Sequence, residues 1–181
     1  MQRQIVVIAC HFKDRQTFCE TTYDRLNEAM IIAEDGDQII VTGEVPYEPC
    51  GPTLGELMQA ALILWGFPED KVSVLHYGVG TFSEARIACD ALRGREIVVV
   101  SSPWYLFQGK PIWQRRAKEN NVEISFVSVP GTGGWRTWVT YIGLGLVVRV
   151  ATLLGLEKVL EDRLTASQQG RRQGFKLDGC K

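Results

Sequence analysis

The chain has 181 residues, 45% of them apolar, which suffices for one hydrophobic core and is too short for two ordinary domains. A formal net charge of -1 excludes a general attraction to phosphate backbones, so we expect no nucleic-acid partner. We expect one domain over residues 1–166 and a flexible tail over 167–181, which contains the basic run GRRQGFKLDGCK.

The start of the chain, MQRQIVVIAC, lacks the order of regions that a signal peptide needs, so a cytoplasmic location is expected. The segment from Thr137 to Leu156 is long enough for a membrane span, but Arg149 and three glycines favour a buried terminal helix. Five cysteines without C-x-x-C spacing and two histidines predict reduced thiols and no zinc site.

Five short apolar runs, each bounded by polar residues, Gly or Pro, are predicted to be strands. Helical periodicity fills the intervals, around residues 26–33, 54–65, 85–92 and, more weakly, 113–117. Strands that alternate with helices predict an α/β fold with a mostly parallel five-stranded sheet covered by helices on both faces. The predicted strands are Ile5 to Ala9, Gln38 to Val41, Val72 to Leu75, Ile97 to Val100 and Ile124 to Val129.

Small and polar residues follow the predicted strands, where open parallel sheets bind their ligands. We therefore expect a small-molecule site there and leave open whether the chain forms a homo-oligomer. The candidate ligand-binding residues are Cys10, His11, Arg15, Arg25, Thr42, Gly43, Glu44, Glu56, Gly80, Thr81, Glu84, Ser101, Ser102 and Tyr105.

The pattern T-x-x-E occurs twice ahead of a helical stripe, at Thr53 with Glu56 and at Thr81 with Glu84. Both match the capping box, in which each side chain bonds the other residue's backbone amide. We expect both motifs to be helix caps. We also expect the two helix starts to converge on one edge of the sheet and to line a binding site there. Carboxylates there favour ribose hydroxyls, a cation or a metal over a free phosphate, and Glu44 and Glu84 are the catalytic candidates.

Three other features have a structural interpretation that we favour over a functional one. Cys10 and His11 are adjacent, so side chains that leave a strand should diverge and a catalytic pair would need an irregular turn. Glu28 follows Arg25 by three residues, which favours a surface ion pair over anion binding. The aromatic residues at 104, 105, 107 and 113 are expected in the core more than in base stacking.

The segments DQIIVTGE, TLGELM, GTFSEAR and VVVSSPWYLFQGKPIW resemble the YdcF-like family, which includes the SanA and ElyC envelope proteins. The resemblance runs from about Ile5 to Pro130 and implies a Rossmann-like three-layer sandwich. Arg25 falls on the family's early R-x-x-x-A, Thr42 on its S-G-G turn and Glu56 on its S-E-A helix start. Some members are reported to bind S-adenosylmethionine, which the resemblance implies as the leading ligand.

The chain departs from the family pattern after the fourth strand. Tyr105 and Gln108 stand where the family typically has His and Arg, so a proton-transfer side chain and an anion-binding side chain of the family are both replaced. Three hypotheses remain: binding of a nucleoside-type metabolite, metal-dependent hydrolysis or transfer on a nucleotide or phosphorylated carrier, or a decayed site in an interaction protein. The second would use Asp14, Glu44, Glu56 and Glu84 as metal ligands, and the third would dock a partner on Trp135 to Leu156.

Overall fold

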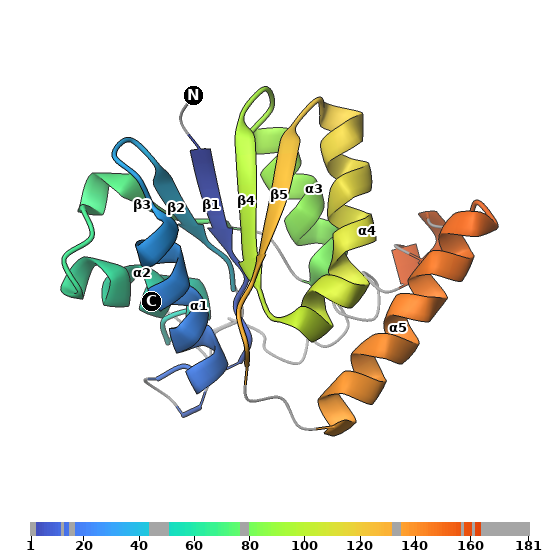
Figure 1. The fold of residues 1–181 in the computed structure, drawn as a ribbon, viewed down its shortest axis with the longest axis horizontal. Coiled ribbons are helices and arrows are strands. Elements are labelled where there is room, and N and C mark those ends of the chain that lie inside the picture. Colours follow the sequence, from blue (N-terminus) through green and yellow to red (C-terminus); the bar gives the residue numbers. More distant parts are fainter. Residues whose placement is uncertain are drawn as a thin grey trace.

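The computed structural model describes residues 3–11, 13–14, 17–43, 51–76, 80–131, 135–156, 158–160 and 162–163. Strands and helices alternate along the chain, as Figure 1 shows. The predicted tail, 167–181, lies outside the described residues. The elements are β1 (Arg3–Val7), α1 (Glu20–Ile32), β2 (Gln38–Val41), α2 (Leu54–Leu64), a 3-10 turn η1 (Glu69–Lys71), β3 (Val72–Val74), α3 (Thr81–Ala91), β4 (Glu96–Ser101), α4 (Pro103–Asn120), β5 (Glu123–Ser128) and α5 (Trp135–Leu153).

The five strands form one sheet in the order β3-β2-β1-β4-β5, and every pair is parallel. The predicted α/β fold is therefore confirmed. β1 begins two residues earlier and ends two earlier than the run Ile5 to Ala9. After the end of β1, the Ile8 amide still donates to the Val100 carbonyl at 3.2 Å. The Ala9 amide instead donates to the Thr42 hydroxyl at 3.0 Å, so a side-chain hydrogen bond takes the place of the backbone bonds between strands.

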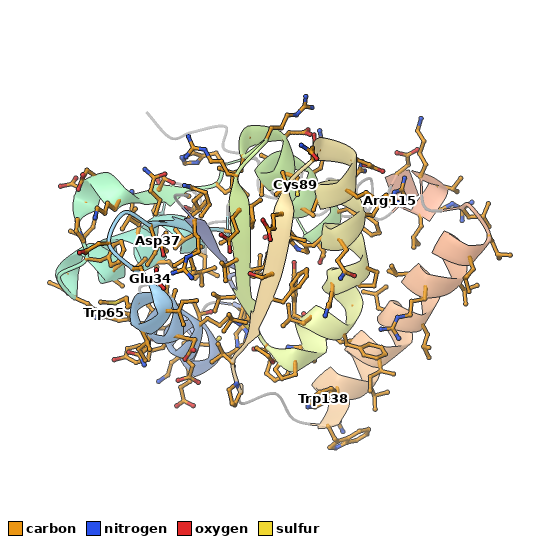
Figure 2. All side chains as sticks on the ribbon, turned by 45° about the horizontal axis from the view of Figure 1, so that its top comes forward. Glu34, Asp37, Trp65, Cys89, Arg115 and Trp138 are labelled. Atoms are coloured by element: carbon orange, nitrogen blue, oxygen red, sulfur yellow. The ribbon has the colours of Figure 1, made fainter. Side chains whose placement is uncertain are left out.

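Alternation of side chains along the strands divides the core into two layers. Ile5 and Val7 pack with α1 and α2 on one face, whereas Val6 and Ile8 pack with α3 and α4 on the other. Cys89 of α3, labelled in Figure 2, is fully buried and belongs to the second of these layers. The sheet is thus covered on both faces, which explains why its strands are apolar on both sides.

Helix α4 carries the aromatic residues that the sequence places after the fourth strand. Trp104, Tyr105 and Trp113 are at most 7% exposed, which confirms that they belong to the core. Pro103 opens the helix, where its missing N–H is not needed, and Asn121 ends it in the left-handed conformation at φ 54°. The helix start therefore lies directly after Ser102, at the edge of the sheet.

Helix α5 corrects the expectation of a buried terminal helix. It packs on α4, where Gly145 lets the two backbones approach and Arg149 lies 4.2 Å from the centre of the Phe107 ring. Its other side is exposed and apolar, as at Val139 and Leu153, because α5 covers a helix and not the sheet (Figure 1). None of the described helices has the length and apolar content that crossing a membrane requires.

Candidate functional site

Polar groups gather at the carboxyl edge of the sheet, between β1 and β4. The strand order reverses there, because β1 connects onward to β2 on one side while β4 lies on its other side. Helices from both faces begin near this edge, so their first turns can place side chains between the two strand ends. Open α/β sheets bind ligands at such a switch point, which makes this edge the candidate site.

Arg25 of α1 is the central cation of this edge. Its side chain is 1% exposed and donates from Nη1 to the Ile8 carbonyl at 2.6 Å. Nε and Nη2 donate to the Ser102 hydroxyl at 3.1 and 2.9 Å. Burial lowers the pKa of the guanidinium. The expected surface ion pair with Glu28 is wrong, because this face of α1 packs against the sheet and Arg25 points to the switch point.

Glu84 of α3 enters the same edge from the opposite face of the sheet. It is 6% exposed and accepts a hydrogen bond from the Tyr105 hydroxyl at 3.3 Å, and the Thr42 hydroxyl is also bonded to it. Tyr105 in turn accepts from Nε1 of Trp113 at 3.4 Å. Gly109 leaves room for the Tyr105 ring, since a Cβ at that position would lie 2.9 Å from it. The carboxyl group is therefore held by α4 and by Thr42, the residue that follows β2.

Burial is the dominant influence on the acidity of Glu84. It raises the pKa of the carboxyl group to about 7, against the hydrogen bonds from Thr42 and Tyr105 and the positive charge of Arg25. The group thus titrates near neutral pH, which suits proton transfer or a switch between accepting and donating hydrogen bonds.

The two T-x-x-E motifs differ in the structure. Thr53 caps α2: its hydroxyl accepts from the Glu56 amide at 3.1 Å, and the Glu56 carboxylate accepts from the Thr53 amide at 2.6 Å. This capping box is confirmed. At α3 the N-cap is Gly80 and Thr81 is already helical, so the predicted second capping box is wrong. The helix begins one residue earlier than expected, and Gly80 precedes it with a φ of 84°, a conformation that favours glycine.

A thiol cluster lies at the start of α1. The Cys10 sulfur is 3.1 Å from Nδ1 of His11, and the ligand atoms of Cys10, His11 and Cys19 all lie within 4.8 Å of one another. The expectation that Cys10 and His11 diverge is wrong, because β1 ends at Val7 and the alternation of a strand no longer applies. Cys19 is the N-cap of α1, and its backbone amide donates to the His11 carbonyl at 3.1 Å.

Two buried polar side chains on the α3 and α4 face of the sheet lack partners. The Ser101 hydroxyl and the Gln4 amide are fully buried and have no hydrogen bond within the described part of the chain. Buried polar groups without a hydrogen bond are rare, because each missing bond costs about 1–3 kcal/mol of stability. Ser101 ends β4 at the candidate edge, directly before Ser102, whose hydroxyl accepts from Arg25.

The remaining predicted residues fall into three groups. Gly43 and Gly80 serve the backbone: Gly43, at φ 114°, accepts from the Gly55 amide at 2.7 Å, and Gly80 caps α3. Glu56 and Asp14 are exposed and bond nearby amides, and in the described residues neither contacts Glu84. Arg15 and Glu44 lie outside the described residues.

The predicted carboxylate metal site is not assembled by the residues that the structure describes. Within them, the cluster able to hold a metal ion is Cys10, His11 and Cys19, and it contains no carboxylate. Sequence reasoning missed Cys19 and its neighbour Thr22, whose hydroxyl accepts from the Cys10 amide at 3.1 Å. The available signal was topological: the end of a first strand and the start of the next helix meet in any βα unit, which brings residues 10 and 19 together.

A shallow depression lies on the opposite edge of the sheet, before β4 and β5. Gly94, Arg95, Asn121, Val122 and Glu123 line it. It is remote from the carboxyl ends of the strands and from Arg25, Glu84 and Ser101. The carboxyl edge, where buried polar and charged side chains converge, is therefore the better candidate for the binding site than this depression.

Comparisons of the chain with protein-family models, curated proteins and solved structures found no significant match.

Proposed function

We propose that this chain binds a small nucleoside-type metabolite at the carboxyl edge of its sheet, with an anionic group of that metabolite beside Arg25. S-adenosylmethionine is the leading candidate, since it offers a carboxylate, a sulfonium and a ribose. The proposal includes a distant relationship to the YdcF-like family, which the sequence segments suggest.

The observation that supports the proposal most is the environment of Arg25. A buried guanidinium is costly unless an anion or a full set of hydrogen bonds compensates it. Its direct partners are neutral oxygens of Ile8 and Ser102. Three of its five N–H groups make these bonds, so two have no partner among the described residues. A carboxylate or phosphate of a ligand would supply the missing acceptor.

The opposite wall of the edge supports a ligand that also carries hydroxyl groups or positive charge. Glu84 is buried with a pKa of about 7, so an approaching cation would favour its ionised form. The Ser101 hydroxyl, which has no hydrogen bond to the described residues, can donate to or accept from the same ligand. Sulfonium and ribose groups match this wall better than a second anion does.

The test is a thermal-shift panel followed by calorimetry on the full chain. The ligands are S-adenosylmethionine, its demethylated product, nucleotides and sugar nucleotides, each with and without magnesium or manganese. A ligand at 100 times its Kd should add about 2.7 kcal/mol, or roughly 5 to 10 °C. We expect a shift with S-adenosylmethionine that does not depend on metal.

A matched pair of arginine variants tests the role of Arg25. Arg25→Lys keeps the charge and loses the planar fork, so it should raise the Kd at least ~10-fold. Arg3→Lys is the control, because Arg3 bonds Asp37 at 2.6 Å on the amino edge of the sheet. Equal affinity in both variants would contradict the proposal. A thermal shift that requires both a metal and a phosphate-containing ligand would support the hydrolase hypothesis. No thermal shift with any ligand of the panel would favour the hypothesis of a decayed site.

A further inference from the structure

The thiol cluster beside the candidate site has features that ligand binding does not use. Two cysteines, nine positions apart in the sequence, place their sulfur atoms within 4.8 Å of each other. The backbone holds them there, since the Cys19 amide bonds the His11 carbonyl and the Cys10 amide bonds the Thr22 hydroxyl. Bringing the sulfur atoms to bonding distance therefore needs side-chain rotation and no change of fold.

Cys19 is placed to be ionised. It is the N-cap of α1, where the helix dipole favours a negative charge. Its sulfur lies 3.5 Å from the Thr22 hydroxyl. That hydroxyl can donate to the sulfur, which further favours the thiolate.

Arg25 adds to this arrangement through its charge. The buried guanidinium interacts electrostatically with both Cys10 and Cys19 and forms no ion pair with a carboxylate among the described residues. That positive charge favours the thiolate form of a nearby cysteine. Cys89 offers the contrast: it is also fully buried, but burial raises the pKa of its thiol to about 12.

We propose that Cys19 and Cys10 form a redox-active dithiol that reacts with a hydroperoxide. Cys19 is 7% exposed, so a small oxidant suits it better than a bulky disulfide. Its thiolate attacks one peroxide oxygen, the O–O bond breaks, and Cys19 becomes a sulfenic acid as hydroxide leaves. The Cys10 thiol then attacks the Cys19 sulfur, forming the disulfide and displacing the sulfenic oxygen as water.

The two steps balance in atoms and electrons. The two thiols together lose two protons and two electrons as the S–S bond forms, and hydrogen peroxide takes them up and becomes two waters. The His11 ring nitrogen, 3.1 Å from the Cys10 sulfur, can accept the Cys10 proton and return it to the departing oxygen. A small dithiol such as dithiothreitol would reverse the disulfide, which completes a cycle.

The experiment uses the full chain without ligand, so its result is independent of the proposed metabolite. Cys50 and Cys180, which lie outside the described residues, are replaced by serine in all variants. Hydrogen peroxide is added at pH 6 to 7, and intact mass and peptide mapping follow the products. We expect a Cys10–Cys19 disulfide, formed at least ~10-fold faster than oxidation of Cys89.

Variants separate the two steps. Cys10→Ser should stop at the sulfenic acid on Cys19, which dimedone traps, and Cys19→Ser should lose the fast reaction. Cys89→Ser is the matched control and should react like the parent, with melting temperatures confirming that every variant folds. Oxidation of Cys19 no faster than Cys89, or no Cys10–Cys19 disulfide, would overturn the proposal. Zinc retained against a chelator, with the thiols protected from peroxide, would overturn it in favour of a metal site.

Discussion

Helices α2 and α3 begin with the same four-residue pattern, yet their glutamates have opposite environments. Glu56 is the third helical residue after its cap, exposed, and bonded to its own N-cap amide. Glu84 is the fourth, because the cap of α3 is Gly80, and it is 6% exposed among Thr42 and Tyr105. A shift of one position turns a side chain by about 100° around a helix. One glycine thus separates a structural cap from a candidate functional acid.

The comparison also predicts opposite responses to pH. The pKa of Glu84 is raised by burial, so the folded state binds its proton more tightly than the unfolded chain does. Its contribution to stability is fully present below about pH 4.5 and is lost as pH rises through about 7. The pKa of Glu56 is lowered by its bonds to Thr53, so its contribution is present above the unfolded pKa and lost in acid.

The largest expected effect comes from Glu84→Gln. An amide removes the cost of burying a charge, which is about 3 kcal/mol for a shift from 4.5 to about 7. We expect the free energy of unfolding of the variant to exceed that of the parent by up to this amount at pH 8. Near pH 4.5 the two free energies should be equal. Urea denaturation across this range measures it, and a constant difference at all pH values would contradict the buried, titrating carboxyl.

Tyr105→Phe should have a smaller effect. It removes the hydroxyl that donates to Glu84 and accepts from Trp113, at a cost of about 1–2 kcal/mol. Losing that donor should also raise the pKa of Glu84 further, which the same pH series would detect. Tyr23→Phe, at a 52% exposed position, is the control and should change neither quantity. Equal loss in both variants would show that the Tyr105 hydroxyl has no special role.

Glu56→Gln should have the smallest effect. An amide keeps the bond to the Thr53 backbone and loses only the charge at the helix start, so the cost is about 0.3 kcal/mol at neutral pH. The cost should vanish as the pH falls below the pKa of the native carboxyl. Stabilisation at pH 8, as expected for Glu84→Gln, would show that the two helix starts are equivalent after all.

The strands were predictable to within two residues, because buried parallel strands are short apolar runs between turns. Much of the site was predictable as well, since parallel topology alone places the residues after Val7, Val41 and Val100 at one edge. The partner of each side chain was not predictable from the sequence. Arg25 has the sequence signature of a surface ion pair, and only the packing of α1 on the sheet turns it inward.

Local chemistry in the sequence therefore determined the element types, their order and the Thr53 cap, because each depends on residues within one or two turns. Tertiary structure decided which polar groups are buried together. The approach of Arg25 to Ser102 and of Tyr105 to Glu84 joins residues 77 and 21 positions apart. It also decided that Cys10 and Cys19 share one environment while Cys89 has another, since burial and neighbouring charge set the acidity of a thiol.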